Sequence, residues 1–198
     1  KLTGFIDAHG KFHETEFYKA FKNGGLFFLD EMDASIPETL ITLNAAIANR
    51  YFDFPNGKIE AHKDFRVIAA GNTFGTGADI EYTGRYQLDA ASLDRFALVE
   101  IDYSEKIENA LADGDSDLVA FVDEFRKATK SAGIRHLVTY RAVERIAKLK
   151  DVLPLHDALK IAFLKHLEKD DLNIILNTFT RAQNTRYYRA AQEVAKCL

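Results

Sequence analysis

The stretch Gly24–Glu31, with the sequence Gly-Gly-Leu-Phe-Phe-Leu-Asp-Glu, constrains the fold more than any other part of the chain. Its apolar run is too short for a helix and is bounded by glycines and acids, which predicts a short buried strand. This strand ends in two adjacent carboxylates, and α/β proteins place ligands at the carboxyl edge of a parallel sheet. Because successive strand side chains point in opposite directions, Asp30 and Glu31 should have different roles. A strand end with two solvated acids is the simpler alternative.

A second short apolar run, Phe65–Ala70, leads into Gly71 and Asn72 and is also predicted to be a buried strand. If the two strands are neighbours in one sheet, the Asn72 amide lies near the two carboxylates. An amide can bond both a water molecule and a phosphate oxygen without adding charge. A simple turn at Gly71-Asn72 is the alternative. A third run, Ala97–Ile101, has the same features and is predicted to be a third buried strand.

Local signals between these runs predict a helix and a hairpin. Ser35 and Glu38 have the spacing of a capping box, and Pro37 suits the first turn, so a helix should begin just after Asp33. The segment Tyr51–Glu60 is predicted to form a β-hairpin, because an Asn-Gly pair separates its two halves.

The character of the sequence changes near residue 104. Before this point, short apolar runs alternate with glycine-bearing turns. After it, apolar residues recur with helical spacing, as at Leu118, Phe121, Val122 and Phe125. The change predicts an α/β domain over residues 1–103 and an α-helical domain over residues 104–198, with a tail helix near the end of the second domain.

Composition narrows the class of protein. Of the 198 residues, 47% are hydrophobic and 28% are charged, which is typical of a soluble globular protein. The net charge of -4 argues against a nucleic-acid coat. A single cysteine, Cys197, excludes an internal disulfide, and no apolar run reaches the roughly 18 residues that span a bilayer. Because the chain begins at Lys1 without Met, we expect a fragment, and composition alone suggests the cytoplasm.

Three motifs together resemble a known family. Phe28-Leu29-Asp30-Glu31 is similar to a Walker B motif, Ala70-Gly71-Asn72-Thr73 to a sensor 1, and Leu93-Asp94-Arg95-Phe96 to an arginine-finger segment. Their order and spacing over nearly all of residues 1–103 resemble the MoxR-like and CbbQ/NorQ-like AAA+ ATPases of the dynein-related branch. The resemblance implies an α/β fold: part of a P-loop NTPase core with a parallel sheet and inserted β-hairpins, followed by an α-helical lid domain.

The resemblance also implies roles for individual residues around ATP and Mg²⁺. Asp30 would hold Mg²⁺ through water, Glu31 would be the catalytic base, and Asn72 would position the attacking water. Arg95 would act at the site of the neighbouring subunit, where it would stabilise charge in the transition state. Arg85 is a candidate for a second such arginine, with a surface or interface salt bridge as the alternative.

The helical half carries one further candidate. His136–Ala142 resembles the start of the lid helix that bears sensor 2, and Arg141 would contact the γ-phosphate. This sequence departs from the family pattern at Thr139-Tyr140, where a pair of small residues is usual.

The phosphate-binding P-loop, Gly-x-x-x-x-Gly-Lys-Ser/Thr, does not occur in this sequence. The segment Gly4–Phe12 is similar, but five residues separate its glycines and Phe12 stands where a hydroxyl must bind Mg²⁺. We therefore expect the P-loop upstream of Lys1, and we expect Gly4–Phe12 to be a hairpin that faces the pore of a ring.

The resemblance implies an ATP-driven remodelling protein: a homo-oligomer, in the form of a hexameric ring, that acts on a client protein, in some relatives with a von Willebrand A-domain partner. A non-hydrolytic binding or scaffold module with the same fold is the main alternative. A metal-dependent nuclease using Asp30, Glu31 and Asp33 is a third possibility. His9, His13 and His62 do not have the spacing of a zinc site and are expected to be surface residues.

Overall fold

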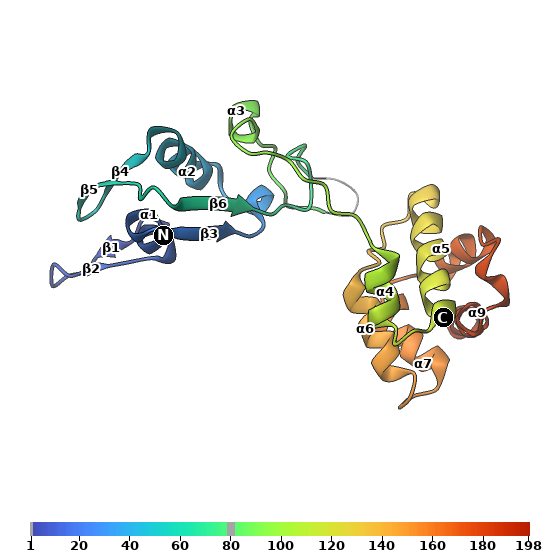
Figure 1. Ribbon diagram of the computed structural model, residues 1–198. Coiled ribbons are helices and arrows are strands. Elements are labelled where there is room, and N and C mark those ends of the chain that lie inside the picture. Colours follow the sequence, from blue (N-terminus) through green and yellow to red (C-terminus); the bar gives the residue numbers. More distant parts are fainter. Residues whose placement is uncertain (1, 79–81) are drawn as a thin grey trace. The chain divides into compact units, whose positions relative to one another are not determined.

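A parallel pair of strands, β3 (Gly25–Leu29) and β6 (Phe65–Ala69), organises the first part of the chain (Figure 1). The structure is a computed structural model that describes residues 2–78 and 82–198. The chain divides into two units, Lys1–Val99 (unit 1) and Glu100–Leu198 (unit 2), and each has a hydrophobic core of its own.

Helix α1 (Glu16–Asn23) covers one face of the β3–β6 pair with aromatic side chains. The ring centroids of Phe17 and Phe27 are 5.2 Å apart, and those of Phe21 and Phe65 are 5.0 Å apart. Helix α2 (Pro37–Asn49) and strand β4 (Tyr51–Phe54) contribute to the same core. Its buried residues are Phe17, Tyr18, Phe21, Leu43, Ala46, Phe54 and Phe65.

The opposite face of the β3–β6 pair is exposed. Leu26, Phe28 and Ile68 are 58%, 55% and 50% exposed, and they alternate with the core-facing Phe27 and Val67. The prediction that both strands are buried was therefore wrong for one of their two faces. A strand in a parallel sheet is buried on both faces only when helices cover both.

The segment Ala97–Ile101 is not a strand in the structure, which corrects the prediction of a third buried strand. Leu98 is 74% exposed and Ile101 is 90% exposed. An apolar run forms a stable strand only when neighbouring strands pair with its amide and carbonyl groups. No strand of the described residues pairs with this segment.

Two antiparallel hairpins flank the parallel pair. Strands β1 (Phe5–Ile6) and β2 (Phe12–His13) lie near the two ends of the Gly4–Phe12 segment and pair with each other. Strands β4 and β5 (Gly57–Glu60) pair over the segment predicted from the Asn-Gly signal. Gly57 has a φ of 121°, a value that L side chains rarely adopt.

Helix α2 begins differently from the capping-box prediction. Ile36 occupies the N-cap position without a side-chain hydrogen bond, and Pro37 is the first helical residue. Ser35 instead ends the preceding 3₁₀ turn η1 (Met32–Ala34), where its N–H donates to the Met32 carbonyl at 3.1 Å. Ser35, which the spacing predicted to be the N-cap of the helix, thus belongs to the end of the preceding turn η1.

Unit 2 is helical throughout the described residues. Its elements are α4 (Glu105–Leu111), α5 (Ser116–Ala132), α6 (Tyr140–Leu149), α7 (Leu155–Leu159), the π-helical turn η2 (Lys160–Leu164), α8 (Lys169–Asn177), the 3₁₀ turn η3 (Ala182–Asn184) and α9 (Arg186–Cys197). The predicted apolar stripe Leu118, Phe121, Val122 and Phe125 is fully buried on α5. None of the helices among residues 2–78 and 82–198 is long and apolar enough to span a membrane.

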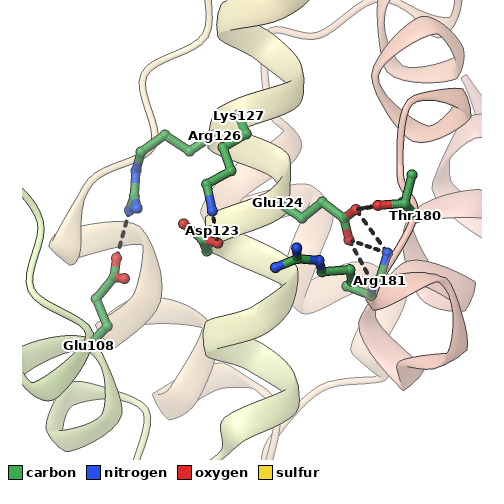
Figure 2. Close-up of polar contacts among 8 residues, drawn as sticks. Glu108, Asp123, Glu124, Arg126, Lys127, Thr180 and Arg181 are labelled. Atoms are coloured by element: carbon green, nitrogen blue, oxygen red, sulfur yellow. Dashed lines mark hydrogen bonds and ion pairs between the residues drawn. The ribbon is translucent and has the colours of Figure 1, made fainter.

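Hydrogen bonds and ion pairs connect helix α4 and the segment after α8 to α5, as Figure 2 shows. Arg126 donates to Glu108 of α4 at 2.6 Å. The Glu124 carboxylate accepts from the backbone amides of Thr180, Arg181 and Ala182 at 2.5–3.2 Å. Burial raises the pKa of Glu124, but these amide hydrogen bonds outweigh it and hold the pKa below its usual value. Helix α4 and the segment that follows α8 are thereby joined to the same helix.

Candidate functional site

The carboxyl ends of β3 and β6 meet at one edge, which confirms the predicted neighbourhood of the two motifs. The strands pair in register from Gly25 with Phe65 to Leu29 with Ala69. Beyond the last pair, the Ala70 N–H donates to the Leu29 carbonyl at 2.9 Å, and the Met32 N–H donates to the Ala70 carbonyl at 2.7 Å. Asp30 and Glu31 therefore leave the sheet beside Gly71 and Asn72.

Asp30 and Glu31 are both exposed at this edge. The Asp30 carboxylate accepts a hydrogen bond from the Glu31 N–H at 2.9 Å. Glu31 has a φ of 51°, which places a residue with a side chain in the left-handed region. Such strain costs about 1–3 kcal/mol and is concentrated at functional sites. Both carboxylates remain accessible to a cation or a water molecule.

Asp33 is the residue at this edge whose role the sequence did not reveal. Its side chain is only 1% exposed. One carboxylate oxygen, Oδ2, accepts from the Asn72 N–H at 3.0 Å, the Thr73 N–H at 2.8 Å and the Thr73 hydroxyl at 2.9 Å. Asp33 therefore holds the loop after β6, and the Asn72 side chain stays exposed at the surface.

Gly71 is the one sequence signal that points to this arrangement. A Cβ on Gly71 would lie 3.3 Å from Cγ of Asp33, so a larger residue would press on the buried carboxylate. A glycine directly before a polar amide indicates such a close approach, in addition to the turn that the sequence suggests.

Because Asn72 and Thr73 occupy one oxygen of the Asp33 carboxylate and Arg85 faces the other, this carboxylate is not free to hold a metal together with Asp30 and Glu31. The part of the chain that the structure describes contains no group of three or more His, Cys, Asp or Glu side chains arranged to hold a metal ion. Asp33 is therefore not available as the third carboxylate that the nuclease alternative would take from this part of the chain.

Arg85 lies between Glu31 and Asp33 in the same chain. Its Nη2 is 3.3 Å from Oε1 of Glu31, and its Nη1 is 3.5 Å from Oδ1 of Asp33. The Arg85 side chain is only 11% exposed. The hydrogen bond to Glu31, aided by the nearby Asp33 charge and opposed by burial, raises the pKa of Arg85 above its usual value. The structure thus gives Arg85 an ion pair within its own chain, and a role of Arg85 at a neighbouring subunit stays a prediction.

Arg95 lies outside this cluster, just after the short helix α3 (Ala90–Leu93). It is exposed and donates to the Ala91 carbonyl. Asp89 caps the helix and accepts from the Ser92 N–H at 2.8 Å and the Ser92 hydroxyl at 2.7 Å. Asn44 of α2 donates to the same hydroxyl at 2.5 Å. These contacts, of which the one between Asn44 and Ser92 is buried, fix the segment that presents Arg95 at the surface.

Arg141 is the second residue of α6 in unit 2, and it is exposed. Tyr140, just before it, accepts a hydrogen bond from the Ser104 N–H at 2.6 Å, which fixes the start of the helix within unit 2. The role of Arg141 as sensor 2 stays a prediction.

Replacing Asp33 with Ala is expected to lower the free energy of unfolding by about 3 kcal/mol, since it leaves the largely buried Arg85 with only the exposed, water-screened Glu31 carboxylate as a partner. The loop amides of Asn72 and Thr73 would also lose their acceptor. Chemical denaturation followed by circular dichroism measures the change. Asp53→Ala, at an exposed position on β4, is the control and should change stability by about 0.5 kcal/mol or less. Equal stability of both variants would contradict the structural role of Asp33.

Unit 1, which contains this edge of the sheet, matches a known protein family over most of its length. Residues 2–96 match the model of the AAA domain of the dynein-related subfamily. This match supports an AAA+ ATPase. The matched residues include Asp30, Glu31, Asn72 and Arg95, and the α/β architecture of unit 1 fits a P-loop NTPase-like fold.

The chain is also similar to proteins of staphylococci. The chain is 26% identical over 174 residues to an uncharacterized protein of Staphylococcus saprophyticus, and this alignment covers 80% of the chain and 64% of that protein. It is 28% identical, with the same coverage, to an uncharacterized protein of Staphylococcus epidermidis. It is 27% identical over 166 residues to one of Staphylococcus aureus, covering 77% of the chain and 60% of that protein. The chain spans 60–64% of the length of these relatives.

Proposed function

We propose that this chain is part of the ATP-binding and ATP-hydrolysing module of a ring-forming, chaperone-like remodelling ATPase of the MoxR-like and CbbQ/NorQ-like kind. The observation that carries the proposal is the shared edge of β3 and β6, where Asp30, Glu31 and Asn72 lie next to each other. Adjacent polar groups of this kind are what phosphoryl transfer to water requires from a protein.

Each of these residues fits a distinct role. The exposed Asp30 carboxylate would hold Mg²⁺ through water, and the exposed Glu31 carboxylate would accept a proton from the attacking water. The Asn72 amide would orient that water, since Asp33 fixes its backbone while its side chain stays exposed. When bound, Mg²⁺ would neutralise charge on the phosphates.

The P-loop would come from a segment that precedes Lys1 in a longer protein, here termed the parent protein. The bare face of the β3–β6 pair supports this proposal, because Leu26, Phe28 and Ile68 are at least half exposed and need an apolar cover. Leu98 and Ile101 offer a further apolar segment without a pairing strand in the described residues. A preceding strand and helix would cover both surfaces and would bring the phosphate-binding loop to the edge that carries Asp30.

The remaining assignments follow from the same proposal. Unit 2 would be the lid domain, with Arg141 contacting the γ-phosphate. Arg95 would reach the site of the neighbouring subunit in a hexameric ring, since it is exposed at the end of a well-fixed segment. The ring would act on a client protein, with a von Willebrand A-domain protein as the partner class.

MgATP binding tests the proposal directly. The parent protein is expected to bind MgATP with a dissociation constant in the micromolar range, measured by isothermal titration calorimetry. The 198-residue chain alone is expected to show no binding at about 1 mM MgATP, a concentration that detects interactions of about -4 kcal/mol. The reason is that P-loop amides and the P-loop lysine supply the main contacts to the phosphates.

Two outcomes would contradict this account. Micromolar binding of MgATP to the 198-residue chain would contradict a P-loop in the preceding segment. A parent protein that folds as a ring but binds no nucleotide would favour the scaffold alternative over the ATPase.

A further inference from the structure

Arg85 joins a carboxylate that is exposed to one that is buried. Glu31, at one end, is 60% exposed at its side chain, and Asp33, at the other end, is 1% exposed. The guanidinium between them is 11% exposed and lies 3.3 Å from Glu31 and 3.5 Å from Asp33. A planar guanidinium can contact two carboxylates through two of its nitrogens, which the single ammonium group of lysine cannot do in the same geometry.

The two contacts of Arg85 differ in strength. Water screens the exposed pair with Glu31, so this pair contributes little and can break readily. The pair with Asp33 is shielded, and its loss would leave an uncompensated buried charge. Arg85 therefore makes its hydrogen bond to the exposed Glu31 and a longer, shielded ion pair to Asp33.

Asp33 extends this connection to the loop after β6. Its Oδ1 faces Arg85, while its Oδ2 accepts from the Asn72 N–H and from Thr73. The backbone of Asn72 is thus linked through Asp33 and Arg85 to the Glu31 carboxylate. A shift of the Asn72 loop would be transmitted to Glu31 by contacts that all lie in one chain.

We propose that Arg85 is a positioning residue that acts within its own subunit, where it holds the Glu31 carboxylate and couples it to the Asn72 loop through Asp33. The inference rests on the proposed function of Glu31 as the base. It gives Arg85 a role that differs from that of an arginine acting at a neighbouring subunit.

Arg85→Ala in the parent protein tests this role by steady-state kinetics. We expect kcat for ATP hydrolysis to fall between about 10- and 100-fold, because a displaced catalytic group loses rate on this scale. The KM for ATP should stay within about twofold, since Arg85 contacts the base and Asp33, and a loss in kcat alone marks an interaction made in the transition state. Arg85→Lys should recover only a small part of the loss and, with its charge retained, provides a second variant if the alanine protein does not fold.

Mixed rings separate action within a subunit from action between subunits. Arg85→Ala subunits mixed with Glu31→Gln subunits should show no recovery of activity, because every subunit then lacks either Arg85 or Glu31. Arg95→Ala subunits mixed with Glu31→Gln subunits serve as the matched control and should recover activity. Recovery in the Arg85 mixture, an unchanged kcat, or a higher KM with an unchanged kcat would each overturn the inference.

The failure of the proposed function gives a different result. If Glu31→Gln leaves hydrolysis unchanged, Glu31 is not the base and the proposed function fails. If the Glu31→Gln protein does not hydrolyse ATP and the Arg85→Ala protein hydrolyses it at the wild-type rate, the positioning role of Arg85 fails while the proposed function stands.

Discussion

The parent protein with Glu31→Gln is expected to hydrolyse ATP about 10²–10⁴-fold more slowly than the wild-type protein, which is the range that a general base contributes. The glutamine cannot accept a proton from water, but it has nearly the same size and leaves Asp30 unchanged. MgATP binding should therefore persist, and the nucleotide-bound oligomer should be longer-lived. Phosphate release measures the rate, and calorimetry measures binding.

A matched control separates the base from a general effect of charge. Glu60→Gln removes the charge of an exposed glutamate on β5 of the same unit and should leave the rate unchanged. If Glu31→Gln and Glu60→Gln both hydrolyse ATP at the wild-type rate, Glu31 has no part in the chemistry.

Arg95→Ala is expected to reduce hydrolysis about 10³–10⁵-fold in uniform rings, the effect of losing an arginine finger in other nucleotide hydrolases. Arg95 is exposed, which suits this role. Hydrogen bonds among Asn44, Ser92 and Asp89 hold the segment that carries it. Mixing these subunits equally with Glu31→Gln subunits should restore activity. About one quarter of the head-to-tail interfaces then join an intact Glu31 to an intact Arg95.

The mixture must be shown to contain mixed rings, for which native mass spectrometry gives the subunit composition. Arg95→Ala rings alone and Glu31→Gln rings alone, each assayed at the total subunit concentration of the mixture, are the controls and should show no recovery of activity. Mixed rings of Arg95→Ala and Glu31→Gln that remain inactive would assign Arg95 to the site of its own subunit.

The sequence predicted the features that depend on short-range patterns. The strand character of β3 and β6, the turn signal before Gly57 and the apolar stripe around Phe121 each reflect local backbone preferences. The meeting of Asp30 with Asn72 followed from the rule that parallel strands end at one edge.

Features that depend on distant contacts could not be read from the sequence. Asp33 reads as one more acid in a turn, because its burial results from amides 39 and 40 residues further along the chain. The Ala97–Ile101 run has strand composition but no neighbour to pair with among the described strands. The sequence also could not show whether Arg85 pairs with carboxylates of its own chain or of a neighbouring subunit. The spacing of residues does not reveal which carboxylates a long side chain reaches.

The buried position of Asp33 changes how degenerate relatives of this domain should be recognised. A gene copy that loses Glu31 through mutation would lose the chemistry and still keep the loop in place, because Asp33 and not Glu31 binds the Asn72 amide. Selection for folding alone would then preserve Asp33 and Gly71 after selection for turnover had ended. Among divergent paralogues, an aspartate at this position would therefore report an intact fold, and a glutamate at the position of Glu31 would report the proposed activity.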